Sequence, residues 1–187
     1  MSGTIPPITY FDQGLSHHFD FSFNHFEDTL PNYNPLNGVP VVATLDFSHN
    51  DFIGNIPVSY GSIPGLETLR VQNNHLSGDL SDIKSSSIAR LAIDNNEFEF
   101  AASDLSKMDR LVSFSGRNNL IFGSMQLSGL SSLEYMDLSQ NRLNEPLDLR
   151  DIAASFAGPL RYLSVRDNAL IPPLKSLPSA IALSRSN

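Results

Sequence analysis

The stretch LETLRVQNNHL, residues 66–76, sets the pattern of the whole chain. Its apolar residues stand at positions 66, 69, 71 and 76, and an asparagine stands at position 74. Leu69 and Val71 alternate with polar residues, which is the two-residue period of a short strand with one buried face. This stretch therefore predicts a strand that ends at a turn near Asn74.

The same pattern returns along the chain, each time with an asparagine at the turn. These asparagines are Asn24, Asn50, Asn74, Asn96, Asn119, Asn141 and Asn168, at steps of 26, 24, 22, 23, 22 and 27 residues. A period of this size indicates a repeat architecture, in which each unit buries its apolar face by stacking on its neighbours. The rest of each unit must carry the chain back, so that successive strands lie parallel.

The repeated pattern, LxxLxLxxNxL, resembles the leucine-rich repeat over nearly the whole chain. Tails such as Gly54-Asn55-Ile56-Pro57 are similar to the plant-type subclass, found in ectodomains of plant receptor-like proteins and in protist surface proteins. The resemblance implies an α/β fold: a right-handed solenoid with a curved parallel sheet on its concave side. Turns, coil and short 3-10 helices would form the convex side. We expect residues 1–187 to be one solenoid segment of about seven to eight coils.

The recurring asparagine has a physical role in such a coil. Where the strand ends, backbone polar groups point inward without a ladder partner, and an amide side chain can both donate to and accept from them. Stacked asparagines would satisfy one coil from the next. The residues just before them, such as Asn73 and Asn95, are expected on the surface.

Strand residues that point outward should line up as columns on the concave face, which is where the resemblance implies that ligands bind. The candidate binding residues are Asp46, Arg70, Gln72, Arg90, Asp94, Arg117, Tyr135, Asp137, Tyr162 and Arg166. Tyrosine and arginine are frequent binding anchors. We therefore expect the strongest binding near Tyr135, Asp137, Tyr162 and Arg166, although these could equally be ordinary exposed strand residues.

Composition narrows the classes of function. Twelve Lys and Arg against twenty Asp and Glu give a net charge of −8, which argues against binding to nucleic acid or anionic membranes. The chain has no cysteine, so disulfides and thiolate metal sites are excluded. We expect no cofactor.

Catalysis and metal binding have weak support in the sequence. Asp46, Ser48 and His49 are neighbours, but no oxyanion donor accompanies them, so we expect no enzyme. His25, Asp51 and His75 each follow a repeat asparagine and could stack across coils, yet rim side chains commonly lie this way without a metal. We therefore expect no metal site.

The expected function is a non-enzymatic interaction module that binds a protein, peptide or glycan. Both ends of the chain fall within a repeat, with Ile181 and Leu183 matching the inward strand positions. The chain is then a window of a longer solenoid, or its ends stack head to tail in a structural assembly, which is the alternative function. An extracellular or cell-surface location is favoured over the cytoplasm, and any secretion signal would lie outside these residues.

Overall fold

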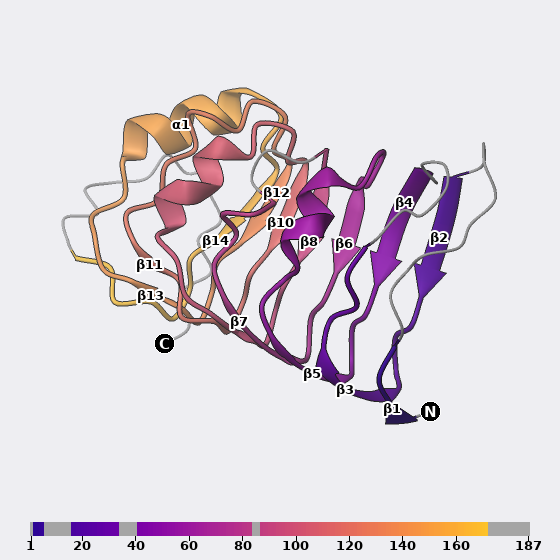
Figure 1. Ribbon diagram of the computed structural model, residues 1–187. Coiled ribbons are helices and arrows are strands. Elements are labelled where there is room, and N and C mark those ends of the chain that lie inside the picture. The colour runs from indigo at the N-terminus through magenta and orange to yellow at the C-terminus, as the bar shows by residue number, and fades with distance from the viewer. Residues whose placement is uncertain (1, 6–15, 34–40, 84–86, 172–187) are drawn as a thin grey trace.

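A parallel sheet of seven strands forms one side of the coil in the described part of the chain. The computed structural model describes residues 2–5, 16–33, 41–83 and 87–171 (Figure 1). In sheet order the strands are β14 (Tyr162–Ser164), β12 (Tyr135–Asp137), β10 (Ser113–Ser115), β8 (Arg90–Ala92), β6 (Thr68–Arg70), β4 (Val41–Asp46) and β2 (Ser16–Asp20). Each strand pairs in parallel with the strand of the next repeat, which is the expected solenoid with its curved sheet on the concave side.

A second parallel sheet follows the repeat asparagines, where we expected mostly turns and coil. It comprises β1 (Ser2–Gly3), β3 (His25–Thr29), β5 (Asp51–Gly54), β7 (His75–Gly78) and β9 (Glu97–Phe98), and a separate pair joins β11 (Phe122–Gly123) to β13 (Arg142–Leu143). In Figure 1, β1, β3, β5 and β7 lie along the lower edge, whereas β11 and β13 lie at the left. These strands alternate between exposed and buried residues, as in buried Phe52 between exposed Asp51 and Ile53. They are too short for this alternation to be recognised in the sequence.

Short helices line the return path of several repeats. The 3-10 helices η1 (Val58–Ser62) and η2 (Ala102–Lys107) agree with the expectation. The last described repeat has instead an α-helix, α1 (Leu149–Ala157), capped by Asp148, whose side chain accepts hydrogen bonds from the backbone of Arg150 and Asp151. Its 27-residue step supplies the extra length that a regular helix needs.

The core is built from the inward strand positions. One buried column runs through Leu45, Leu69, Leu91, Phe114, Met136 and Leu163, which are paired in register across the sheet. Gly116 stands where neighbouring coils place a larger apolar residue. The ring of Phe114 fills the gap, because a Cβ on Gly116 would lie 2.6 Å from Phe114 Cε1. Phe122, eight positions after Phe114 in the chain, is exposed and does not contribute to this packing.

The expectations about the ends of the chain, including Ile181 and Leu183, fall outside the described residues. The extent of the solenoid over residues 1–187, its number of coils and the head-to-tail alternative therefore remain predictions.

Candidate ligand-binding face

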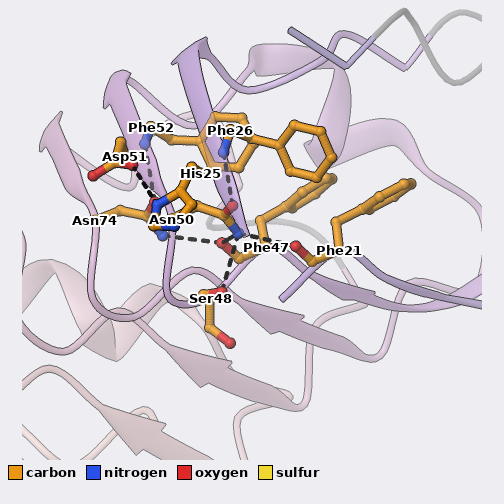
Figure 2. A network of polar contacts seen from close by, with 9 residues as sticks. All are labelled: Phe21, His25, Phe26, Phe47, Ser48, Asn50, Asp51, Phe52 and Asn74. Atoms are coloured by element: carbon orange, nitrogen blue, oxygen red, sulfur yellow. Dashed lines mark hydrogen bonds and ion pairs between the residues drawn. The ribbon is translucent and has the colours of Figure 1, made fainter. Parts of the chain in front are cut away.

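The repeat asparagines hold the end of each concave strand in place. Figure 2 shows Asn50, whose Nδ2 donates to the carbonyl of Phe21 in the preceding coil at 2.9 Å. The same nitrogen lies 3.1 Å from the carbonyls of Phe47 and Ser48 in its own coil. Asn50 Oδ1 accepts a hydrogen bond from the backbone N–H of Phe26 at 3.0 Å. One amide thus satisfies backbone groups in two coils.

This arrangement recurs in every later described coil. Asn74, Asn96, Asn119, Asn141 and Asn168 each donate to a carbonyl of the preceding coil, over distances of 2.8–3.0 Å. Each also accepts a hydrogen bond from a backbone N–H of that coil. Asn24 donates to two carbonyls of its own coil. We infer that these bonds keep the outward columns in a fixed register.

The residue before each repeat asparagine adopts a left-handed backbone conformation. These residues are Phe23, His49, Asn73, Asn95, Asn118, Gln140 and Asp167, with φ between 53° and 59°. Asparagine tolerates this region best among non-glycine residues. This preference accounts for the doublets Asn73-Asn74, Asn95-Asn96 and Asn118-Asn119, a sequence signal for the corner. Their side chains form a surface row: Asn95 donates to Asn73 at 2.8 Å, and Asn118 donates to Asn95 at 3.0 Å.

The outward strand residues form straight columns across the sheet. The middle column pairs Asp20, Asp46, Arg70, Ala92, Ser115, Asp137 and Ser164 in register. The flanking column pairs His18, Thr44, Thr68, Arg90, Ser113, Tyr135 and Tyr162. The structure therefore brings Tyr135 next to Tyr162, and Asp46 next to Arg70.

Charges of both signs lie along this face. Arg70 Nη1 lies 3.5 Å from Asp46 Oδ2. The pKa of Asp20 is lowered, chiefly because the Ser22 hydroxyl and the Ser22 N–H donate to its carboxylate. Asp94 Oδ1 accepts from the Ser115 hydroxyl at 2.6 Å and from the Arg117 N–H at 2.9 Å.

Two other candidate residues differ in how their polar atoms are satisfied. Arg90 is exposed at the start of β8. Gln72 is half-buried, and its Oε1 is a buried atom without a hydrogen-bond partner among the described residues. Gln72 is thus the one candidate that contributes an unsatisfied buried acceptor in this part of the chain.

The C-terminal part of the face carries an aromatic pair beside a hollow. The rings of Tyr135 and Tyr162 stack with centroids 4.6 Å apart and planes 6° from parallel. The hollow has a volume of about 110 Å³. Its lining residues are Arg117, Asp137, Ser139, Gln140, Tyr162, Ser164, Arg166 and Asp167. Three of the four residues where we expect the strongest binding thus surround one hollow, and the fourth, Tyr135, stacks on the ring of Tyr162.

Sequence reasoning missed four of the lining residues. Gln140 and Asp167 occupy the left-handed corners of their coils, while Ser139 and Ser164 lie on the floor beneath the longer side chains. The corner position could have been found from the asparagine doublets, because the first asparagine of each doublet occupies the same position in other coils. The serines carry no such signal, because small polar residues occur throughout the outward columns.

Several known proteins are similar to this chain in sequence or in fold. Receptor-like protein 7 of Arabidopsis thaliana is 37% identical over 106 residues, which are 55% of this chain and 11% of that protein. The crystal structure of PEPR1-AtPEP1 superimposes with a TM-score of 0.71 at 26% identity, covering 90% of this chain and 24% of the other. The chain forms a leucine-rich repeat solenoid and resembles plant receptor-like proteins in sequence.

More distant structures share the fold of this leucine-rich repeat protein. The Arabidopsis receptor kinase HAESA, in complex with the peptide hormone IDA and the co-receptor SERK1, has a TM-score of 0.65 at 21% identity, covering 82% of this chain and 30% of that one. A plant ice-binding protein also has a TM-score of 0.65, at 22% identity, over 82% of this chain and 49% of that one. No family model matches the sequence. The chain spans about a tenth of the length of Receptor-like protein 7.

The residues that suggested catalysis do not form a relay in this leucine-rich repeat protein. The Ser48 hydroxyl donates to Asp46 Oδ1 at 2.6 Å, whereas the His49 ring stacks on Phe23 with centroids 4.1 Å apart. His49 Nε2 lies 3.2 Å from Asn73 Nδ2. A serine nucleophile needs its hydroxyl bonded to a histidine, and this hydroxyl is directed to the carboxylate instead.

The histidines of the second sheet do not gather around one point. His25 Nδ1 lies 3.6 Å from Asp51 Oδ2, and both side chains are largely exposed. Within the described residues, no three histidine or acidic side chains are placed to hold a metal ion. Over those same residues no helix has the length and apolar character required to cross a bilayer, and α1 has nine residues.

Tyr135 of this leucine-rich repeat protein should lose its phenolic proton at a higher pH than an ordinary tyrosine. Burial raises the pKa of Tyr135, and the negative charge of Asp137 raises it further. Protonated Tyr135 thus stabilises the fold below about pH 10, and this contribution is lost as the pH rises through the higher folded-state pKa. We expect the ¹³Cζ resonance of Tyr135 to titrate above the usual midpoint, and Asp137→Asn to lower that midpoint. Identical midpoints in the two proteins would show that Asp137 has no influence on the ring.

Proposed function

We propose that the concave sheet of this protein binds an extended segment of a protein or peptide partner, without catalysis. The observation that carries the proposal is the stacked pair Tyr135 and Tyr162 beside the polar hollow. The two rings are 36% and 44% exposed on a face that is otherwise polar. Large aromatic side chains that remain exposed beside arginine are typical of binding anchors.

The columns suit a partner that lies across the strands. Neighbouring parallel strands are about 4.8 Å apart, so an extended chain crossing them meets a new outward side chain at each step. Charges of both signs lie along its path, from the pair of Asp46 and Arg70 to Arg117 and Asp137. Such a face favours hydrogen bonds and single charge pairs with a partner of mixed charge, and it disfavours a polyanion.

The relatives support this proposal and its setting. HAESA, which shares the fold, was crystallised with a peptide hormone and a co-receptor. Receptor-like protein 7 and Receptor-like protein 18 of Arabidopsis are similar in sequence. We therefore propose that the protein acts at the cell surface or outside the cell, as a module that recognises a ligand rather than converting it.

Selection from a random peptide library displayed on phage tests the proposal. We expect peptides that bind the wild-type protein and lose about 30-fold in affinity for Tyr162→Ala, the loss typical of an anchor residue worth about 2 kcal/mol. Phe122→Ala is the matched control, because Phe122 is an aromatic residue of similar exposure, 42%, on β11 outside the concave sheet.

One outcome would contradict binding at the concave sheet. If Phe122→Ala weakened the selected peptides while Tyr162→Ala left their affinity unchanged, the ligand would bind outside the concave sheet. Circular dichroism and melting temperatures of both variants must match those of the wild type, so that a loss of binding is not a loss of folding.

A further inference from the structure

The hollow beside Tyr162 brings several unused hydrogen-bonding groups together in one place. It lies at the ends of β12 and β14, with the small side chains of Ser139 and Ser164 on its floor. Arg117 and Arg166 stand at its sides.

Three equivalent triplets show what is unusual about its floor. Residues 20–22, 46–48 and 137–139 all read Asp-x-Ser and occupy the same register in their coils. In the first two, the serine hydroxyl donates to the aspartate at 2.5 and 2.6 Å. In the third, only the backbone N–H of Ser139 donates to Asp137 Oδ1, at 2.8 Å. Within the described residues, the Ser139 hydroxyl has no hydrogen-bond partner, so it is free to bind a ligand.

The two arginines also keep hydrogen-bonding capacity. Arg117 donates through Nε to Gln140 Oε1 at 3.0 Å, and Arg166 Nε lies 3.0 Å from Asp167 Oδ2. Their terminal Nη groups make no hydrogen bond to the described part of the chain. Each guanidinium is thus oriented by its Nε contact while its other donors remain available.

The charges of the lining cancel. Arg117 and Arg166 face two carboxylates, those of Asp137 and Asp167. A ligand anion would gain from the arginines and be repelled by the aspartates. An apolar side chain would leave these groups unpaired, at a cost for every polar group that it removes from water.

We propose that the hollow binds one neutral sugar residue, carried by a glycan on the partner of the concave face. A sugar hydroxyl both donates and accepts, which matches a lining that offers guanidinium donors, carboxylate acceptors and serine hydroxyls. The apolar C–H face of the ring can lie against the exposed part of Tyr162. This inference rests on the proposed function, because it adds a glycan subsite to the same face.

Saturation-transfer NMR with the protein and free monosaccharides tests the proposal. The probes are glucose, galactose, mannose and N-acetylglucosamine, with galacturonate and inorganic phosphate as the anionic comparison. We expect at least one neutral sugar to bind with a millimolar Kd. The double variant Ser139→Ala/Ser164→Ala should weaken it about tenfold, the loss of two neutral hydrogen bonds. Ser48→Ala is the matched control and should leave the affinity unchanged, because that hydroxyl already binds Asp46.

Several outcomes would overturn the inference: no neutral sugar binds at millimolar concentration, only the anionic probes bind, or the sugar binds the double variant as well as the wild type. The peptide selection separates the two proposals. Peptides that depend on Tyr162 without any sugar binding would retain the proposed function and refute the glycan subsite. Sugar binding that depends on Ser139 and Ser164, without any selected peptide, would retain the glycan subsite and refute the proposed binding of a peptide segment.

Discussion

Replacing Asn74 by leucine should lower the free energy of unfolding by about 3 kcal/mol, because a buried backbone group without a partner costs about 1–3 kcal/mol. Asn74 Nδ2 donates to the carbonyls of Phe47 and Val71, and Asn74 Oδ1 accepts from the N–H of Phe52. All of these groups are in the buried interior of the coil. Leucine has nearly the same size but neither donates nor accepts, so it would leave them unsatisfied.

Urea and thermal denaturation measure this loss. A decrease of about 3 kcal/mol corresponds to a fall of about 6–12 °C in Tm for a chain of this length. Asn74→Asp is the informative companion, since a carboxylate keeps the acceptor for Phe52 but cannot donate when ionised. Gln126→Leu is the control, because Gln126 is an exposed amide. A Tm for Asn74→Leu within the range of that control would contradict the structural role of the asparagine.

A single added methyl group at Gly129 should destabilise the protein by about 3 kcal/mol or more, the upper range for overpacking in a close-packed interior. A Cβ at this position would lie 2.1 Å from the backbone oxygen of Ser106 in the preceding coil. Gly61 stands in the same relation to the oxygen of Asp82, again at 2.1 Å. In both places the added Cβ would clash with a backbone oxygen, which cannot move away by a rotamer change as a side chain can. The coils would have to separate on the convex side.

Gly158→Ala provides the matched comparison, because its Cβ would meet the nearest atom, Ser155 O, at 3.3 Å. We expect a loss of about 1 kcal/mol or less there. Far-ultraviolet circular dichroism during urea denaturation gives both values. Equal stability of Gly129→Ala and Gly158→Ala would mean that the coils of this protein are not in contact at Gly129.

Much of the concave face was predictable because its residues obey a strict period. The alternation around Leu69 and Val71 separates the buried column from the outward columns, and the spacing of the asparagines aligns one coil with the next. Parallel pairing then makes neighbours of residues that share a phase, such as Tyr135 and Tyr162. No long-range information was needed for this step, since the register follows from the repeat itself.

The convex side was less predictable because its residues lack a common phase. The steps between asparagines vary from 22 to 27 residues, and the excess falls in the return path, which forms the 3-10 helices η1 and η2 in two coils and α1 in another. The second sheet was missed because strands of two to five residues leave too short a pattern. The role of Gly129 was invisible as well, since the atom that it must avoid lies 23 positions earlier in the chain.

The sequence by itself determined the parallel coil, its buried column and the residues that share an outward face, because a fixed spacing of apolar and amide side chains leaves one way to bury the first and satisfy the second. Only the tertiary structure decided which polar groups are already satisfied. The triplets at Ser48 and Ser139 are alike in sequence, yet one hydroxyl binds its aspartate and the other is left without a partner. That difference lies in the orientation of a side chain, which two triplets of the same pattern do not specify.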